Sequence, residues 1–381
     1  MTAISRPRVL IVFGGRSSEH EISCSTAAGI LTAIDRTKWD VIPLGITRDG
    51  QWVRVADDPS ALEFKDGKGQ SVTAGSTRVA LTPGEGNLVE LTYEGDPDAP
   101  DSRVVGVEDL GHVDIVFPLL HGPYGEDGTI QGLCEMVGVP YTGCGVAASA
   151  NGMDKEYAKI LFERGGLPVG KYFSITDYAW RHRTNVVPDE VRSWGLPVFV
   201  KPARAGSSLG ITRVTDWSQF EAAVEKARRH DPKVLIESGA NHPREIECAV
   251  LEGRNGQAPR TTPPGEVVMM QTPDMYDFES NYFPHDAVQL QIPADIPAEV
   301  AARIQDMARR AFQLLGGEGL SRVDFFYLEA SGQLILNEVN TMPGMTPFSL
   351  YPGMWANAGL SYRDLVTELI ELALAHPQGL R

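Results

Sequence analysis

Oxygen-bearing side chains recur at a two-residue interval near the C-terminal end of the chain. Asp324 stands on one arm of a predicted β-hairpin over 322–340, and Glu338 and Asn340 stand on the other arm. Side chains two residues apart on a strand project from the same face. Two carboxylates and an amide oxygen suit a hard cation such as Mg²⁺, which phosphoryl-transfer sites hold with carboxylates, phosphate oxygens and water.

The turn of this hairpin decides whether the oxygen ligands share a face. A three-residue turn at 330–332 places Asp324 opposite Glu338, whereas a turn of two or four residues places them on opposite faces. The alternative interpretation is an ordinary solvated strand face. Leu334 and Leu336 are expected on the face of Glu338, which argues against simple solvation.

A glycine- and serine-rich loop at 206–210 follows Lys201, which ends a predicted strand over 196–202. Small residues let backbone N–H groups approach phosphate oxygens closely, and a lysine neutralises them. The chain contains no G-x-x-x-x-G-K-[ST] segment, which argues against a P-loop NTPase. Taken alone, such a loop is more often a simple turn.

Two polar loops follow predicted parallel strands, at the sheet edge where ligands of α/β proteins usually bind. Glu19 lies in the segment 14–21 after the first strand and could hold an ammonium group. His121 lies after the strand 113–118, as a ligand-binding group or as a hydrogen-bonded loop histidine. For the segment 14–21 the alternative is a surface turn.

Composition limits the class of protein. The 381 residues include 34 Lys and Arg against 50 Asp and Glu, and the resulting net charge of −16 with no basic cluster argues against a nucleic-acid partner. The longest apolar stretch, 112–120, is too short to span a membrane, so we expect a soluble, cytoplasmic protein without a membrane partner. The cysteines form no C-x-x-C pair, which suggests reduced thiols.

Strand and helix patterns alternate in the first part of the chain, which predicts an α/β fold with a parallel sheet. The segment 56–105 interrupts this alternation with many Gly, Pro, Asp and Ser residues, and we interpret it as a hairpin-rich insertion. The predicted strands of the first domain, 1–145, are 8–13, 39–46, 113–118 and 139–142, and its predicted helices are 25–34 and 129–137.

The remainder predicts two α+β modules, over 146–236 and 237–381. The first has a helix over 154–164 and strands at 196–202 and 234–237. In the second, a helix over 297–315, the hairpin over 322–340 and a helix over 362–375 are predicted.

Five segments of the chain, in order, resemble the motifs of the D-alanine–D-alanine ligase family. They are 14–23, 120–132, 153–155, 201–208 and 337–345. The resemblance spans nearly the whole chain and is weakest over 56–105. It implies a three-domain ATP-grasp architecture, in which an N-terminal parallel-sheet, Rossmann-like domain is followed by two α+β domains that enclose ATP.

The resemblance also implies the reaction. Such a ligase uses ATP to phosphorylate the carboxylate of one D-alanine, and the amine of a second D-alanine then attacks the acyl phosphate, which supplies D-alanyl-D-alanine for peptidoglycan. Positioning and charge stabilisation dominate both steps, so no nucleophilic side chain is needed. The implied cofactors are ATP and two Mg²⁺ ions, with Mn²⁺ as a substitute, and the implied assembly is a homodimer.

Residue roles follow from motif position. At ATP, the resemblance implies Lys155 and Lys201 on the phosphates with Ser208 nearby, Glu237 at the adenine amine and Glu245 at the ribose. It implies Asp324, Glu338 and Asn340 as the Mg²⁺ ligands. At the substrates it implies Glu19 on the first ammonium with Ser207 and Tyr282, Arg322 and the Gly344 N–H on the oxyanion, Ser349 and Leu350 at the second substrate, and His121 in the pocket.

One departure from the family concerns the loop 276–282. The family usually has Lys immediately before the tyrosine, whereas this chain has Asn281, and a neutral amide cannot replace that charge. His285 is a possible substitute, and Tyr282 favours an amine over a lactate acceptor. The alternatives are therefore a related ligase with a different amino or hydroxy acid acceptor, or a nucleotide-binding protein that has lost catalysis.

Overall fold

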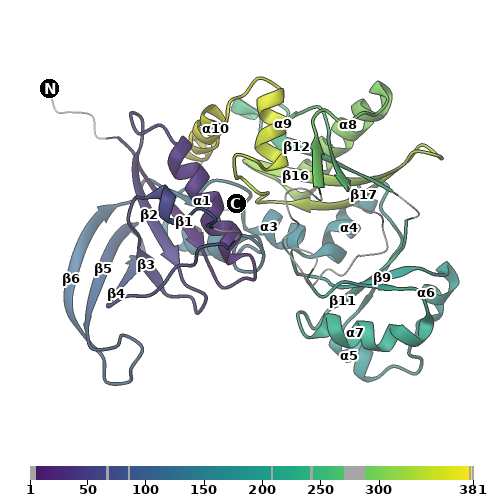
Figure 1. The fold of residues 1–381 in the computed structure, drawn as a ribbon, viewed down its shortest axis with the longest axis horizontal. Helices are drawn as coiled ribbons and strands as arrows, with labels where there is room; N and C mark the ends of the chain where they lie inside the picture. The colour runs from purple at the N-terminus through teal and green to yellow at the C-terminus, as the bar shows by residue number, and fades with distance from the viewer. Residues whose placement is uncertain are drawn as a thin grey trace.

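The chain begins with the parallel β–α–β arrangement that its sequence predicts (Figure 1). The computed structural model describes residues 6–65, 68–84, 86–206, 209–240, 243–269, 288–376 and 379. Its first sheet has the order β3-β2-β1-β7, with β2 and β7 parallel to β1 and β3 antiparallel at the edge. These strands are β1 (Arg8–Gly14), β2 (Asp40–Ile46), β3 (Trp52–Arg54) and β7 (Ile115–Pro118).

Helices α1 (His20–Ala33) and α2 (Thr129–Val137) belong to this first unit. The predicted bounds of α2 are confirmed, but α1 begins five residues before the prediction, so Glu19 immediately precedes it. The prediction of a strand over 139–142 is wrong, because Tyr141 makes only an isolated bridge with Val116. One pair of residues cannot build a ladder, although it still holds this segment against the sheet.

The segment 56–105 begins a separate antiparallel sheet, which curves away from the first sheet at the left of Figure 1. Its strands are β4 (Thr77–Leu81), β5 (Asn87–Glu94) and β6 (Arg103–His112), and a short helix η1 (Pro59–Ala61) precedes them. Ahead of β4, the Val72 N–H donates to His20 Nε2 over 3.0 Å. This segment therefore contacts the start of α1.

A four-stranded antiparallel sheet with the order β10-β9-β11-β8 forms the lower right of Figure 1. Its strands are β8 (Tyr172–Ile175), β9 (Val198–Pro202), β10 (Thr212–Val214) and β11 (Val234–Ser238). Its helices are α5 (Asp177–Arg181), α6 (Asp189–Trp194), η2 (Trp217–Gln219) and α7 (Phe220–Arg228). Val200, Phe220 and Ile236 are fully buried where helix and sheet meet, so this unit has its own core.

The largest sheet has the order β15-β14-β12-β16-β17, and β13 pairs with β12. Its strands are β12 (Arg244–Leu251), β13 (Arg260–Thr261), β14 (Gly265–Met269), β15 (Val288–Gln291), β16 (Leu320–Leu328) and β17 (Gln333–Asn340), and η3 (Arg254–Gly256) lies between β12 and β13. Helices α3 (Val146–Met153), α4 (Lys155–Arg164) and α8 (Ala298–Leu315) share a buried core with this sheet.

The helices α9 (Leu350–Asn357) and α10 (Tyr362–Ala375) link the first unit to the last. One continuous core contains residues of β1, α1 and both of these helices. Helices α3 and α4 pack on the largest sheet rather than on β8–β11. The domain boundaries after residues 145 and 236 stay predictions. No helix among the described residues is long and apolar enough to cross a membrane. The four cysteines are buried free thiols.

Candidate active site

The β16–β17 hairpin places Asp324 directly opposite Glu338, although its turn differs from the prediction. Leu328 pairs with Gln333, so the turn has four residues, 329–332, and the prediction of three is wrong. A β-bulge at Asn337 restores the alignment, because it inserts one extra residue into β17 before Glu338. A longer turn and a bulge therefore compensate for each other.

The same bulge separates the leucines from the acidic residues. Leu334 and Leu336 are buried in the core beneath the sheet, whereas Glu338 and Asn340 are partly exposed on its other face. The prediction that the leucines share the face of Glu338 is wrong, because the extra residue reverses the alternation of side chains. Asp324 and Arg322 alternate with fully buried residues of β16 and lie on the same partly buried face as Glu338.

Strand β12 adds two further carboxylates to this face. Glu245 pairs with Phe326, and Glu247 pairs with Asp324. Sequence reasoning missed Glu247, although its spacing of two residues from Glu245 is a usable signal. We refer to Glu245, Glu247, Asp324 and Glu338 as the acidic face.

Arg322 lies within the acidic face and partly neutralises it. Its Nε lies 2.8 Å from Asp324 Oδ1 and 2.8 Å from Glu247 Oε2, and a second guanidinium nitrogen donates to Asp324 Oδ2 over 2.7 Å. The Asn340 amide donates to the same Asp324 oxygen over 2.9 Å. One guanidinium group thus serves two carboxylates.

Burial and mutual repulsion raise the pKa values of the central carboxyl groups. Burial is the main cause for Glu247, whose pKa rises to about 8 against the lowering effect of Arg322. Asp324 and Glu245 shift upward for the same main reason. Burial also acts on Glu338, but Lys155 and Lys201 hold its pKa below the usual value. A cation bound at this face would lower these pKa values and favour the ionised carboxylates.

A metal site built by protein side chains alone is absent from the described part of the chain, which contains no cluster of three His, Cys, Asp or Glu residues able to hold an ion. The available donors are the opposed carboxylates of Asp324 and Glu338 and the amide of Asn340. Magnesium ions commonly complete such a partial set with phosphate oxygens and water. The donor set fits Mg²⁺ bound together with a phosphate-bearing ligand.

Three lysines approach the acidic face from α4 and β9. Lys155 Nζ donates to the Ala205 carbonyl over 3.0 Å and lies 3.4 Å from Glu338 Oε2. Lys201 Nζ lies 2.6 Å from Glu237 Oε2, and Lys159 Nζ lies 3.1 Å from Glu237 Oε1. We refer to Lys155, Lys159, Lys201 and Glu237 as the lysine cluster.

The lysine cluster is buried, which affects its titration. Burial raises the pKa of Glu237, but Lys159 and Lys201 outweigh it and lower this pKa to about 2. Burial lowers the pKa of Lys201, and nearby Lys159 and Lys155 add to that effect. Sequence reasoning missed Lys159, although a lysine four residues after Lys155 lies on the same side of a predicted helix.

Glu19 lies where loops of two different sheets meet. A Cβ atom on Gly122 would lie 2.7 Å from Glu19 Oε2, and one on Gly206 would collide with the same oxygen. A side chain at either glycine would therefore displace this carboxylate from its observed position. Gly206 is adjacent in sequence to the predicted site residue Ser207.

His121 is buried and bridges the first unit to the loop after β17. Its Nδ1 lies 3.1 Å from the Met342 carbonyl, and its Nε2 lies 3.2 Å from Thr26 Oγ1. Burial lowers its pKa, which favours the neutral ring. Glu126, which sequence reasoning missed, accepts hydrogen bonds from the N–H groups of Gly122 and Met342, over 2.9 and 3.3 Å.

The remaining predicted substrate residues lie in the loop before α9 and at its start. Ser349 Oγ lies 2.7 Å from Thr346 Oγ1, and a Cβ on Gly344 would lie 3.1 Å from Ser349 Oγ. Leu350 is buried in the first core and contacts Gly265, so its side chain packs within the protein. Five residues considered in the sequence analysis fall outside the described residues: Ser207, Ser208, Asn281, Tyr282 and His285.

Comparisons with known proteins agree with this architecture. Residues 8–144 match the family described as D-ala D-ala ligase N-terminus, and residues 161–371 match D-ala D-ala ligase C-terminus. A D-alanine–D-alanine ligase of Paenarthrobacter aurescens is 51% identical over 99% of this chain and 97% of its own. Another, from Kineococcus radiotolerans, is 50% identical over 100% of both chains.

Solved structures have the same fold over nearly the whole chain. The VanG D-Ala:D-Ser ligase of Enterococcus faecalis aligns with a TM-score of 0.77 and 33% identity, over 97% of this chain and 100% of its own. The D-alanine–D-alanine ligase of Coxiella burnetii aligns with a TM-score of 0.75 and 30% identity, over 97% and 94%. The fold is the ATP-grasp fold, and the chain belongs to the D-alanine–D-alanine ligase family.

Proposed function

We propose that this chain joins two D-alanine molecules to form D-alanyl-D-alanine, with ATP as the energy source, for peptidoglycan synthesis. The observation that carries the proposal is the opposition of Asp324 and Glu338 beside the lysine cluster, in a chain of this ligase family. Carboxylates for a divalent cation and lysines for phosphates are the groups that phosphoryl transfer requires.

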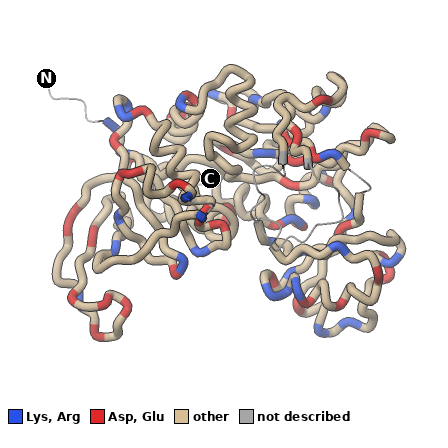
Figure 2. The backbone as a smooth tube through the Cα atoms, viewed as in Figure 1, with Lys and Arg blue, Asp and Glu red and all other residues tan. Residues whose placement is uncertain are grey.

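The nucleotide is assigned to the place where the lysine cluster meets the acidic face. Lys155 and Lys201 contact its phosphates, with Ser208 nearby, and Glu237 accepts a hydrogen bond from the adenine amine. Glu245 binds the ribose hydroxyls. The positive charge of residues 171–236, which include 11 Lys and Arg against 7 Asp and Glu, supports this assignment because ATP is an anion. Blue residues are correspondingly frequent at the lower right of Figure 2.

Asp324, Glu338 and Asn340 are the proposed ligands of two Mg²⁺ ions, or of Mn²⁺ in their place. The metal ions would neutralise charge on the transferring phosphoryl group. The raised pKa values on the acidic face support this proposal, because an added cation would favour the ionised carboxylates.

The reaction then needs two transfers. A carboxylate oxygen of the first D-alanine attacks the γ-phosphorus of ATP, which yields an acyl phosphate and ADP. The neutral amine of the second D-alanine attacks the acyl carbon, and inorganic phosphate leaves as the peptide bond forms. Arg322 and the Gly344 N–H are the proposed groups that stabilise negative charge on the tetrahedral intermediate.

Glu19 is the proposed partner of the first substrate's ammonium group, together with Ser207 and Tyr282. Its position between loops of two sheets supports this role, since closure of those loops would fix the substrate. His121, neutral and held by Met342 and Thr26, orients the pocket wall. Ser349 is assigned to the second carboxylate. Leu350, whose side chain is buried, contributes to this pocket as support for the loop.

The decisive experiment measures ATP- and Mg²⁺-dependent phosphate release with D-alanine alone and identifies the product by mass. L-alanine, D-alanine with D-lactate, and D-alanine with D-serine are the comparison substrates. D-alanyl-D-alanine as the main product supports the proposal. ATP binding without ADP formation would instead support a protein that has lost catalysis.

A second candidate function, ligation to a different acceptor, rests on Asn281. The family lysine at this position would clamp the γ-phosphate and the second carboxylate, so its absence predicts weaker binding of the second substrate or slower transfer. Restoring the charge with Asn281→Lys tests this. A lower KM for the second D-alanine would identify Asn281 as the cause, whereas unchanged kcat and KM would remove this concern.

The location and assembly of the enzyme are also proposed from the family. A homodimer is expected because the family is usually dimeric. A cytoplasmic location is expected because the substrates are cytoplasmic small molecules. Light scattering on the purified protein, with and without ATP, measures the assembly directly. A monomeric mass in both conditions would reject the homodimer without affecting the reaction.

A further inference from the structure

Lys159 is the most deeply buried member of the lysine cluster, and no role in the proposed reaction uses it. It is 2% exposed and lies on α4, four residues after Lys155. Lysine is almost never buried this completely unless its charge is paired. Its partners therefore indicate what it does.

Among the described residues, the Lys159 ammonium group has two partners, which lie on different elements. Nζ lies 3.1 Å from Glu237 Oε1 on β11 and donates to the Asn337 carbonyl on β17 over 3.3 Å. Lys155, one turn earlier on α4, instead reaches the Glu338 carboxylate, and Lys201 reaches the other oxygen of Glu237. Lys159 thus connects the two halves of the proposed nucleotide site.

We infer that Lys159 is a positioning residue that couples recognition of the adenine amine, through Glu237, to placement of the metal ligand Glu338, through the bulge at Asn337. This inference rests on the proposed function, because it takes Glu237 as the adenine contact and Glu338 as a metal ligand. In this proposal Lys159 acts through Glu237 and Asn337 and is assigned no contact of its own with nucleotide or metal.

The first half of the coupling follows from the charge of Glu237. A carboxylate accepts a hydrogen bond from the adenine amine best when it is ionised, and burial opposes its ionisation. Lys201 and Lys159 both favour the ionised form, but Lys201 is also the lysine proposed to bind phosphate. When Lys201 turns toward phosphate, Lys159 is the cation that remains beside Glu237.

The second half follows from the bulge. Asn337 is the extra residue that aligns Glu338 with Asp324, and its carbonyl receives the Lys159 hydrogen bond. A bulge leaves one residue outside the regular ladder. A side chain from another element that donates a hydrogen bond to this residue therefore stabilises the irregular geometry. Loss of the donor is therefore expected to loosen the position of Glu338.

The test compares ATP with purine riboside triphosphate, which lacks only the 6-amino group. For the unaltered enzyme we expect kcat/KM to favour ATP by roughly 10- to 100-fold, because the analogue leaves a buried acceptor unpaired. In Lys159→Met this preference should fall about tenfold, and the Mg²⁺ concentration for half-maximal activity should rise several-fold. The matched control is Lys233→Met, which removes a lysine whose side chain is 12% exposed and is paired with Asp154 and Glu156.

The control should keep both the nucleotide preference and the Mg²⁺ response, since a general loss of stability lowers activity with both nucleotides equally. A Lys159→Met enzyme that keeps the full preference for ATP and the normal Mg²⁺ response would overturn the inference. If the unaltered enzyme itself does not prefer ATP, the assigned role of Glu237 is wrong. The Mg²⁺ response then tests only whether the Lys159 contact with Asn337 positions Glu338.

Lys159→Gln provides a second variant if the methionine enzyme does not fold. Glutamine retains a donor for the Asn337 carbonyl but not the charge beside Glu237. We expect it to lose the preference for ATP and to keep a nearly normal Mg²⁺ response. The reverse pattern, with the preference retained and the Mg²⁺ response lost, would contradict the division of roles between the two contacts.

Discussion

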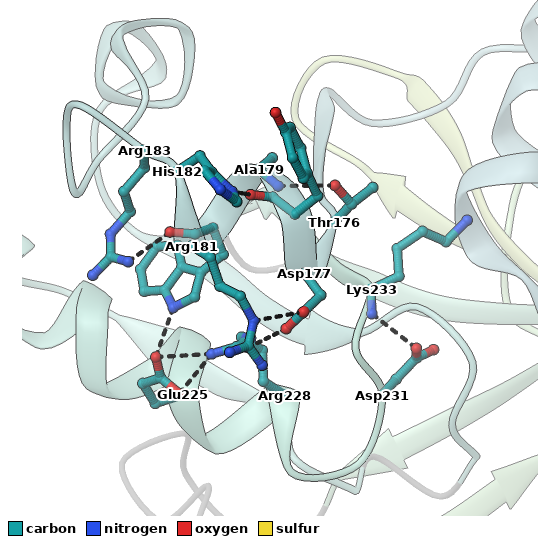
Figure 3. A network of polar contacts seen from close by, with 12 residues as sticks. Thr176, Asp177, Ala179, Arg181, His182, Arg183, Glu225, Arg228, Asp231 and Lys233 are labelled. Atoms are coloured by element: carbon teal, nitrogen blue, oxygen red, sulfur yellow. Dashed lines mark hydrogen bonds and ion pairs between the residues drawn. The ribbon is translucent and has the colours of Figure 1, made fainter.

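Two polar networks in this protein contain similar side chains and differ in their surroundings. The lysine cluster lies against the acidic face, and the side chains of Lys201 and Glu237 are 9% and 11% exposed. The second network joins α5 to α7 beside the β10-β9-β11-β8 sheet (Figure 3). In this surface network the side chains of Arg181 and Glu225 are 65% and 50% exposed.

The surface network is as richly bonded as the buried one. Trp180 donates to Glu225 over 2.6 Å, Arg181 pairs with Asp177 at 2.7 Å, and Arg228 bonds to both carboxylates. Water screens these pairs, so each contributes about 1 kcal/mol or less to stability. The buried charges lack that screening, and removing one partner leaves an uncompensated charge. The comparison shows that burial, rather than the number of hydrogen bonds and ion pairs, distinguishes the lysine cluster from the surface network.

The largest expected effect comes from Glu338→Gln. This change keeps the side-chain volume but removes a charged metal ligand, so kcat should fall roughly 10³-fold or more. Phosphate release measures the loss, and circular dichroism checks the fold. Glu225→Gln on the surface network is the matched control, and its kcat should stay within about twofold of the unaltered value. Near-normal turnover of Glu338→Gln would reject the metal assignment.

A smaller but still large effect is expected on stability from Glu237→Gln. The change leaves Lys159 and Lys201 without their shared carboxylate, which should cost about 3–5 kcal/mol of the free energy of unfolding. On the surface network, Asp177→Asn should cost about 1 kcal/mol or less. Urea denaturation measures both. Equal losses in the two variants would contradict the difference that we assign to burial.

The pH dependence of stability should also separate a partly buried site carboxyl from a surface one. Burial and nearby Glu19 raise the pKa of Glu126 to about 8, above its ordinary value of 4.5. The native state therefore binds more protons than the unfolded state between these pH values, and stability falls as pH rises through this range.

Glu126→Gln cannot lose a proton at this position. Between pH 5 and pH 9 its free energy of unfolding should therefore fall by roughly 2 kcal/mol less than that of the unaltered protein. Urea denaturation across this range measures the slope. Glu225→Gln is again the control, because the Trp180 hydrogen bond lowers the pKa of Glu225 and places its titration below this range. Parallel pH profiles for Glu126→Gln and the unaltered protein would show that Glu126 is ionised throughout.

The smallest effect is expected from Arg181→Ala. The Arg181 side chain is mostly exposed, and its ion pair with Asp177 is of the i, i+4 type within α5. The free energy of unfolding should change by about 0.5 kcal/mol or less, with kcat unchanged. A loss above 2 kcal/mol would mean that the surface network acts as a cooperative unit.

Local sequence patterns predicted most elements of the fold. The apolar run 8–13 and the helix 129–137 appear where they are predicted, because strand and helix periodicity are properties of neighbouring residues. The start of α1 was predicted too late, because His20 and Ser23 are polar residues buried by contacts with distant segments. Glu247 and Lys159 were missed for the related reason that their partners lie on other elements.

The sequence by itself determined the identity and order of the reactive groups. These are the motif segments, the oxygen ligands of β16 and β17, and the lysines Lys155 and Lys201. Only the tertiary structure decided how these groups meet. A bulge at Asn337 corrects the register that a four-residue turn would otherwise break, and Lys159 holds that bulge from another element. The physical reason is that register and burial depend on contacts between segments far apart in the chain, whereas periodicity reports only on neighbours.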